Sequence, residues 1–98
     1  MVKITAVKVA KYDDLIAKYE NPISHACNIR EGDVFISKNV EKPANFCSEA
    51  WKTIKEFVEA LEAGKDNFYD GWMKDPKSAM ISCNDGFRPV SFYIEFIK

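Results

Sequence analysis

The sequence lacks any apolar run near the roughly 18 to 20 residues that a membrane-spanning helix needs. It also lacks a basic run, because 14 lysines and arginines are interleaved with 15 aspartates and glutamates. Proteins that bind nucleic acid normally concentrate positive charge on one face. We therefore expect neither a membrane nor a nucleic acid among the partners of this chain.

Several motifs with known chemistry are also missing. The chain has no glycine-rich phosphate loop, no paired-carboxylate arrangement and no nucleophile elbow. No repeat or flexible linker divides it, and 98 residues leave room for one domain. The apolar fraction of 47% is that of a globular protein with a hydrophobic core. We predict a single domain over residues 1–98, and whether it is an enzyme stays open.

Cysteine is scarce, and its count is odd. Cys27, Cys47 and Cys83 do not match the even-numbered disulfide framework of small secreted proteins. The apolar N-terminal stretch 1–9 is interrupted by lysines and lacks a small-residue cleavage site, so we expect a strand and not a signal peptide. Reduced thiols and a cytoplasmic location are the resulting expectations.

Local patterns predict an α+β domain with a mainly antiparallel, four-stranded sheet. β-Branched residues favour a first strand over 2–11, and an acidic start favours a short helix over 13–19. Glu31-Gly32-Asp33 is a turn signal before a second strand around 34–36. Residues 65–78 show neither helical nor strand periodicity, so we expect an ordered loop held by its aromatic residues.

Residues 46–63 carry the strongest helical pattern of the chain. Apolar residues recur at spacings of three and four and form one face, while charged residues fall on the other. The apolar face comprises Cys47, Ala50, Trp51, Ile54, Phe57, Val58 and Leu61. Asn45 or Ser48 is expected to cap the start of this helix, and Gly64 its end.

The chain closes with a predicted hairpin of strands 79–83 and 88–97. Asp85-Gly86 between two apolar runs is typical of a two-residue turn of type I′. The resulting pairs are Cys83 with Arg88, Ile81 with Val90, and Ala79 with Phe92, with Ile81, Val90 and Phe92 on the core side. Arg88 then lies at the rim of that side, beside a thiol.

A guanidinium in this position needs an anionic partner, because it cannot lose its charge and is costly to bury alone. Two alternatives remain open for Arg88. It is either an internal clamp for Asp85, Glu95 or a C-terminal carbonyl, or the binding group for an anionic ligand.

The thiols have two interpretations as well. Cys47 lies in the first turn of the long helix, where the helix dipole favours a thiolate. Alternatively, Cys47 and Cys83 are both small buried side chains of the core, as free cysteines commonly are. Cys27, Cys47 and Cys83 together with His25 could ligate a metal, although the usual Cys-x-x-Cys spacing is absent. No cofactor is otherwise indicated.

The aromatic residues are also candidates either for the core or for a binding surface. Trp51 is expected in the core, whereas Tyr69 and Trp72 in the long loop either fold back on the core or line a pocket or partner surface.

Two cysteine-centred motifs carry a resemblance to a known family. Phe46-Cys47-x-x-Ala50-Trp51 begins the long helix, and Cys83-x-Asp85-Gly86-x-Arg88-Pro89-Val90-x-Phe92 spans the hairpin. With Trp72, and with Cys27 before Gly32-Asp33-x-Phe35, this pattern resembles a family of short prokaryotic proteins of unknown function. The resemblance implies no activity. It implies that Cys27, Cys47, Cys83, Asp85 and Arg88 should be considered together.

Three functional hypotheses follow. The first is a binding domain for a small anionic ligand or a metal centre near Cys47, Cys83, Asp85 and Arg88, with Trp72 as a wall. The second is a non-enzymatic module for protein interaction or self-association, which uses a sheet edge or the aromatic residues of 68–73 and can form a homo-oligomer. The third is a thiol-redox protein with a reversible Cys47–Cys83 disulfide.

Overall fold

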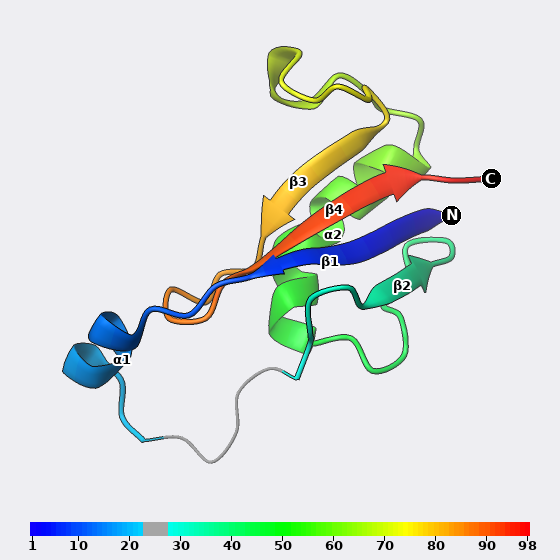
Figure 1. Cartoon of the computed structure of the whole chain (residues 1–98). Coiled ribbons are helices and arrows are strands. Elements are labelled where there is room, and N and C mark those ends of the chain that lie inside the picture. Colours follow the sequence, from blue (N-terminus) through cyan, green and yellow to red (C-terminus); the bar gives the residue numbers. More distant parts are fainter. Residues whose placement is uncertain (23–27) are drawn as a thin grey trace.

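A computed structural model describes residues 1–22 and 28–98 (Figure 1). Within these residues, four strands form one sheet in the order β2-β1-β4-β3, and every neighbouring pair is antiparallel. The elements in chain order are β1 (Val2–Val9), α1 (Asp13–Tyr19), β2 (Val34–Ser37), α2 (Ser48–Glu62), the 3-10 turn η1 (Phe68–Asp70), β3 (Ser78–Ser82) and β4 (Val90–Phe96). The predicted α+β class, with its antiparallel sheet and C-terminal hairpin, is confirmed.

The core lies between α2 and one face of the sheet, across which α2 runs in Figure 1. On β1 the alternate residues Val2, Ile4 and Ala6 are fully buried, as the two-residue period of a strand requires. The buried residues of α2 are Ala50, Trp51, Ile54, Val58 and Leu61, so the predicted apolar face and the core position of Trp51 are confirmed. Burying one large aliphatic side chain contributes about 1.5–3 kcal/mol.

The start of α2 differs from the prediction. Its N-cap is Cys47, which makes no side-chain capping bond. Asn45 cannot serve because it lies upstream of the cap in a left-handed conformation (φ +64°), and Ser48 is already helical. The helix therefore begins without the oxygen acceptor that the sequence suggested.

The end of α2 agrees with the prediction. Gly64 has a φ of +90°, a left-handed conformation that a glycine adopts without a side-chain clash. Its amide donates to the Leu61 carbonyl (3.0 Å), and the Lys65 amide donates to the Ala60 carbonyl (2.9 Å). This pair of bonds is the Schellman arrangement, which satisfies carbonyls that the last helical turn leaves unpaired.

The C-terminal hairpin has a different register from the predicted one. β3 and β4 are joined by residues 83–89, and Ile81 pairs with Phe92 while Ala79 pairs with Ile94. The residue of β4 that pairs with each residue of β3 thus lies two positions later in the sequence than predicted. Because side chains alternate with a period of two, this shift leaves the same residues facing the core. Both Ile81 and Phe92 are buried.

α1 is attached loosely at one end of the molecule. The first strand ends at Val9, short of the expected residue 11, although the Ala10 and Tyr12 amides still donate to the carbonyls of Pro89 and Phe87. α1 follows, with no buried residue, and lies beyond the end of the sheet (Figure 1). The radius of gyration is 14.2 Å, against about 12.6 Å for a compact chain of this length. No helix of the described residues is long and apolar enough to cross a membrane.

Candidate docking surface

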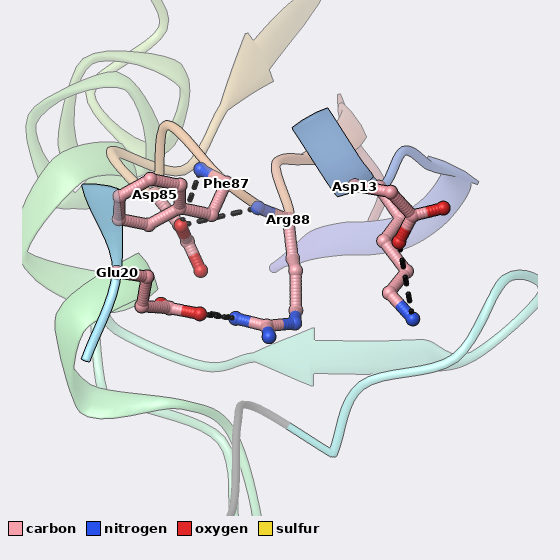
Figure 2. Close-up of polar contacts among 6 residues, drawn as sticks. Asp13, Glu20, Asp85, Phe87 and Arg88 are labelled. Atoms are coloured by element: carbon pink, nitrogen blue, oxygen red, sulfur yellow. Dashed lines mark hydrogen bonds and ion pairs between the residues drawn. The ribbon is translucent and has the colours of Figure 1, made fainter. Parts of the chain in front are cut away.

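Asp85 organises the loop between β3 and β4. Its Oδ1 atom accepts hydrogen bonds from the backbone amides of Phe87 (2.8 Å) and Arg88 (3.1 Å), as Figure 2 shows. The side chain thereby replaces a backbone turn. Gly86 is not left-handed, so the predicted type I′ turn is wrong. Asp85-Gly86 lies in a loop longer than the predicted two-residue turn, because the aspartate side chain accepts the hydrogen bonds of the backbone amides that follow it.

Arg88 is paired with a residue far away in the sequence. Its Nη1 atom lies 2.9 Å from Oε1 and 3.1 Å from Oε2 of Glu20, which follows α1 (Figure 2). Both side chains are largely buried, with 24% of Arg88 and 15% of Glu20 exposed. The guanidinium therefore has the anionic partner that its position requires, and the pair fastens the end of α1 to the hairpin loop.

The two described cysteines are free thiols at the boundary of the core. Cys83 lies opposite Val90 and not opposite Arg88: its amide donates to the Val90 carbonyl (3.0 Å), and its Sγ accepts from the Val90 amide (3.3 Å). Cys47 occupies the N-cap position of α2 without a side-chain capping bond, and both cysteine side chains are half-buried against the core. Among the described residues, no three His, Cys, Asp or Glu side chains gather as metal ligands. Cys27 and His25 lie outside those residues.

A second cluster lies at the opposite end of β3. Three aromatic rings follow one another from α2 outward: Phe57, Tyr69 and Trp72, which we call the aromatic ladder. The ring centroids of Phe57 and Tyr69 are 6.3 Å apart, and those of Tyr69 and Trp72 are 5.7 Å apart. Trp72 is 83% exposed, the highest value among the exposed large apolar residues of the described chain. An aromatic surface is thus held in place but left uncovered.

The loop that carries the ladder has an unusual backbone. Within residues 67–71, Asn67, Tyr69, Asp70 and Gly71 all have a left-handed conformation. This conformation costs an ordinary residue such as Tyr69 about 1–2 kcal/mol, whereas asparagine and aspartate adopt it more readily. This conformation is held in place because Phe68 is buried against the core, 6.0 Å from the Phe57 ring. The burial of Phe68 therefore fixes the positions of the aromatic side chains on either side of it.

The base of the loop is closed by hydrogen bonds. The Asn67 amide donates to the Pro76 carbonyl (2.9 Å). Asp75 accepts from the Lys77 amide (2.9 Å) through Oδ1 and from the Ser78 hydroxyl (2.7 Å) through its carbonyl. The fully buried Ser78 is therefore satisfied, and the loop enters β3 in a defined orientation.

β3 is an edge strand beside this ladder. The bonds from Cys83 to Val90 and from Phe96 to Lys77 show that the odd-numbered residues of β3 bond to β4. Because an antiparallel ladder alternates, the amides and carbonyls of residues 78, 80 and 82 point away from β4. Ser78 is fully buried, so the open part of this edge is formed by Met80 and Ser82. The Met80 carbonyl accepts one bond, from the Tyr69 hydroxyl (3.3 Å). The ladder and the outward groups of β3 form one surface, the β3 docking surface.

The predicted site residues thus lie in three parts of the described chain. Cys83, Asp85 and Arg88 belong to the hairpin loop at one end of β3, whereas Trp72 lies in the loop at its other end (Figure 1). Cys47 lies at the start of α2. Sequence reasoning missed Glu20 and Met80. Nothing in the sequence signals the Glu20 contact, but the alternation along β3 could have marked Met80 as an exposed residue.

The chain was also compared with known proteins. No family model, curated protein or solved structure matches it. The resemblance to a family of short prokaryotic proteins stays a prediction.

Proposed function

We propose that this domain is a non-enzymatic protein-interaction module, and that it binds through the β3 docking surface. One observation carries the proposal: Trp72 is 83% exposed and its ring lies against the ring of Tyr69. The Tyr69 side chain is itself fixed by a hydrogen bond to the Met80 carbonyl. Tryptophan and tyrosine dominate the binding energy of protein interfaces. A ring already held in position loses little conformational entropy when a partner covers it.

The strand edge complements the aromatic ladder. Residues 78–82 contain no charge and no proline, the two devices that most often protect an exposed edge. The outward backbone groups of Met80 and Ser82 can pair with an extended segment of a partner, whereas those of the fully buried Ser78 cannot. Trp72 and Tyr69 then provide an apolar contact for side chains of that segment, a combination found in recognition by strand addition.

The geometry gives less support to the other two hypotheses. The charge of Arg88 is balanced by Glu20, and Asp85 is engaged by two backbone amides, so both residues already have partners inside the fold. Cys47 and Cys83 are both free thiols that are half-buried against the core. The β3 docking surface, by contrast, presents groups whose partners are still to be supplied.

Panning of a random peptide-display library against the immobilised domain tests the proposal. We expect enriched peptides whose affinity, measured by titration calorimetry, falls more than about 10-fold in Trp72→Ala, since a central tryptophan typically contributes 2 kcal/mol or more. Trp72→Phe should retain part of the affinity. Lys52→Ala is the matched control, because Lys52 is exposed on α2. Enriched peptides that bind Trp72→Ala as tightly as the wild type would overturn the proposal, as would a library that yields no binder.

A further inference from the structure

We infer that the partner of the β3 docking surface is an extended peptide segment that carries a proline at the position paired with Met80. The inference rests on the proposed function, because it uses the same surface and names the chemistry of the partner. The feature that selects proline is the set of backbone groups that the β3 edge leaves without a hydrogen bond.

The edge of β3 offers three backbone groups to a partner. Ser78 is fully buried and takes no part. At Met80 the carbonyl accepts from the Tyr69 hydroxyl (3.3 Å), whereas the amide has no acceptor among the described residues. At Ser82 the amide and the carbonyl both lack a partner in the same part of the chain, since only the hydroxyl is bonded, to the Cys83 carbonyl. The edge therefore presents a lone donor at Met80, and a donor together with an acceptor at Ser82.

A lone donor selects a partner residue that has no amide hydrogen. In an antiparallel ladder, a bonded residue pair exchanges two hydrogen bonds, one in each direction. A partner residue opposite Met80 accepts from the Met80 amide, but it turns its own amide toward a carbonyl that Tyr69 already occupies. An ordinary residue thus buries a donor without gaining an acceptor, which lowers the affinity. Proline keeps the carbonyl and has no amide hydrogen, so it avoids this cost.

The position two residues before the proline has the opposite requirement. In the antiparallel arrangement this residue pairs with Ser82, whose amide and carbonyl have no partner among the described residues. It must therefore supply an amide as well as a carbonyl, and a second proline does not fit there. The residue between these two positions is kept extended by the proline that follows it, as strand pairing needs.

The aromatic ladder suits the ring of this proline. The Tyr69 hydroxyl lies at the Met80 carbonyl, and the centroid of the Trp72 ring is 5.7 Å from that of the Tyr69 ring. A proline opposite Met80 therefore arrives beside two aromatic rings, one of which is 83% exposed. Proline-rich segments bind aromatic surfaces with little loss of entropy, because the proline ring already restricts their backbone.

Two peptide-display libraries test the inference. Both contain short random peptides with one fixed central residue, proline in the first library and alanine in the second. We expect binders that depend on Trp72 to come mainly from the proline library. In the tightest of these peptides, replacement of the fixed proline by alanine should weaken binding by about 10-fold in titration calorimetry, because it introduces a buried donor without an acceptor. A second proline two positions earlier should weaken binding by a similar factor.

Tyr69→Phe provides the sharper test, because it keeps the ring and removes the hydroxyl that occupies the Met80 carbonyl. This carbonyl can then accept from a peptide amide, so the alanine peptide should bind the variant nearly as tightly as the proline peptide. The matched control is Tyr19→Phe, which removes a hydroxyl from an exposed ring on α1. The control should keep the full preference for proline, and circular dichroism checks that both variants fold.

Three results would overturn the proline inference and leave the proposed function standing. They are Trp72-dependent binders that come equally from both libraries, a proline preference that persists in Tyr69→Phe, and a loss of that preference in Tyr19→Phe as large as in Tyr69→Phe. If neither library yields a binder that depends on Trp72, the proposed function itself is overturned, and the inferred proline falls with it.

Discussion

Replacement of Asp85 tests whether this residue builds the hairpin loop. Its Oδ1 atom accepts two backbone amides, at 2.8 and 3.1 Å, in a half-buried position. A hydrogen bond to a charged acceptor contributes about 1.5–3 kcal/mol, and partial exposure together with the sharing of one oxygen reduces the sum. We expect Asp85→Ala to lower the free energy of unfolding by about 2 kcal/mol, a decrease in Tm of roughly 8–16 °C.

Urea unfolding followed by tryptophan fluorescence is the appropriate assay. Trp51 is 8% exposed and will report the loss of the core, whereas Trp72 is already in water and will change little. Asp85→Asn is the matched control, because its side-chain oxygen can accept the same two amides. We expect this variant to lose less than about 1 kcal/mol, with an unchanged dependence of stability on urea.

Two results would refute this explanation of the loop. If Asp85→Ala stayed within about 0.5 kcal/mol of the wild type, the size of an ordinary surface substitution, the two bonds would not stabilise the fold. If Asp85→Asn were as unstable as the alanine variant, the effect would come from the charge and not from the acceptor. The first outcome would again make Asp85 available as a ligand-binding residue.

Three further predictions concern a backbone conformation, the core and one phenol. Gly64→Ala should cost about 1–2 kcal/mol in urea unfolding because of its left-handed φ, whereas Gly86→Ala should be nearly neutral, since its φ is ordinary and an added Cβ meets nothing within 4 Å; equal losses would contradict the loop geometry. Ile54→Ala should cost about 2–5 kcal/mol because the side chain is fully buried, and the exposed Val34→Ala is its control. Burial raises the pKa of Tyr69 above 10.0, so the folded chain keeps a proton that the unfolded chain releases, and stability should fall as the pH rises through 10.0 toward the folded pKa. An ultraviolet titration should show a late ionisation that is absent in Tyr69→Phe.

Much of the fold follows from local patterns in the sequence. The two-residue alternation of the strands and the three- and four-residue spacing of α2 identify which side chains are buried, and Gly64 marks where the helix ends. These features depend on near neighbours. They are correct because each local preference agrees with the packing around it.

The rest depends on contacts that no local pattern records. The Arg88–Glu20 pair joins residues 68 positions apart, and nothing near either residue indicates the other. The hairpin register was wrong because the Asp85 side chain competes with the backbone turn that Asp-Gly favours. The aromatic loop has no period of its own, since Phe68 is buried by tertiary packing while Trp72 is left in water.

The loose attachment of α1 has a consequence for how the molecule opens. A seven-residue helix without a buried side chain is not stable alone. It therefore depends on the Glu20–Arg88 ion pair after it and on the two backbone hydrogen bonds that Ala10 and Tyr12 donate just before it. Its own amides should exchange with deuterated solvent long before those of β4. This end of the molecule is thus a unit that can detach and re-form while the sheet and α2 remain intact.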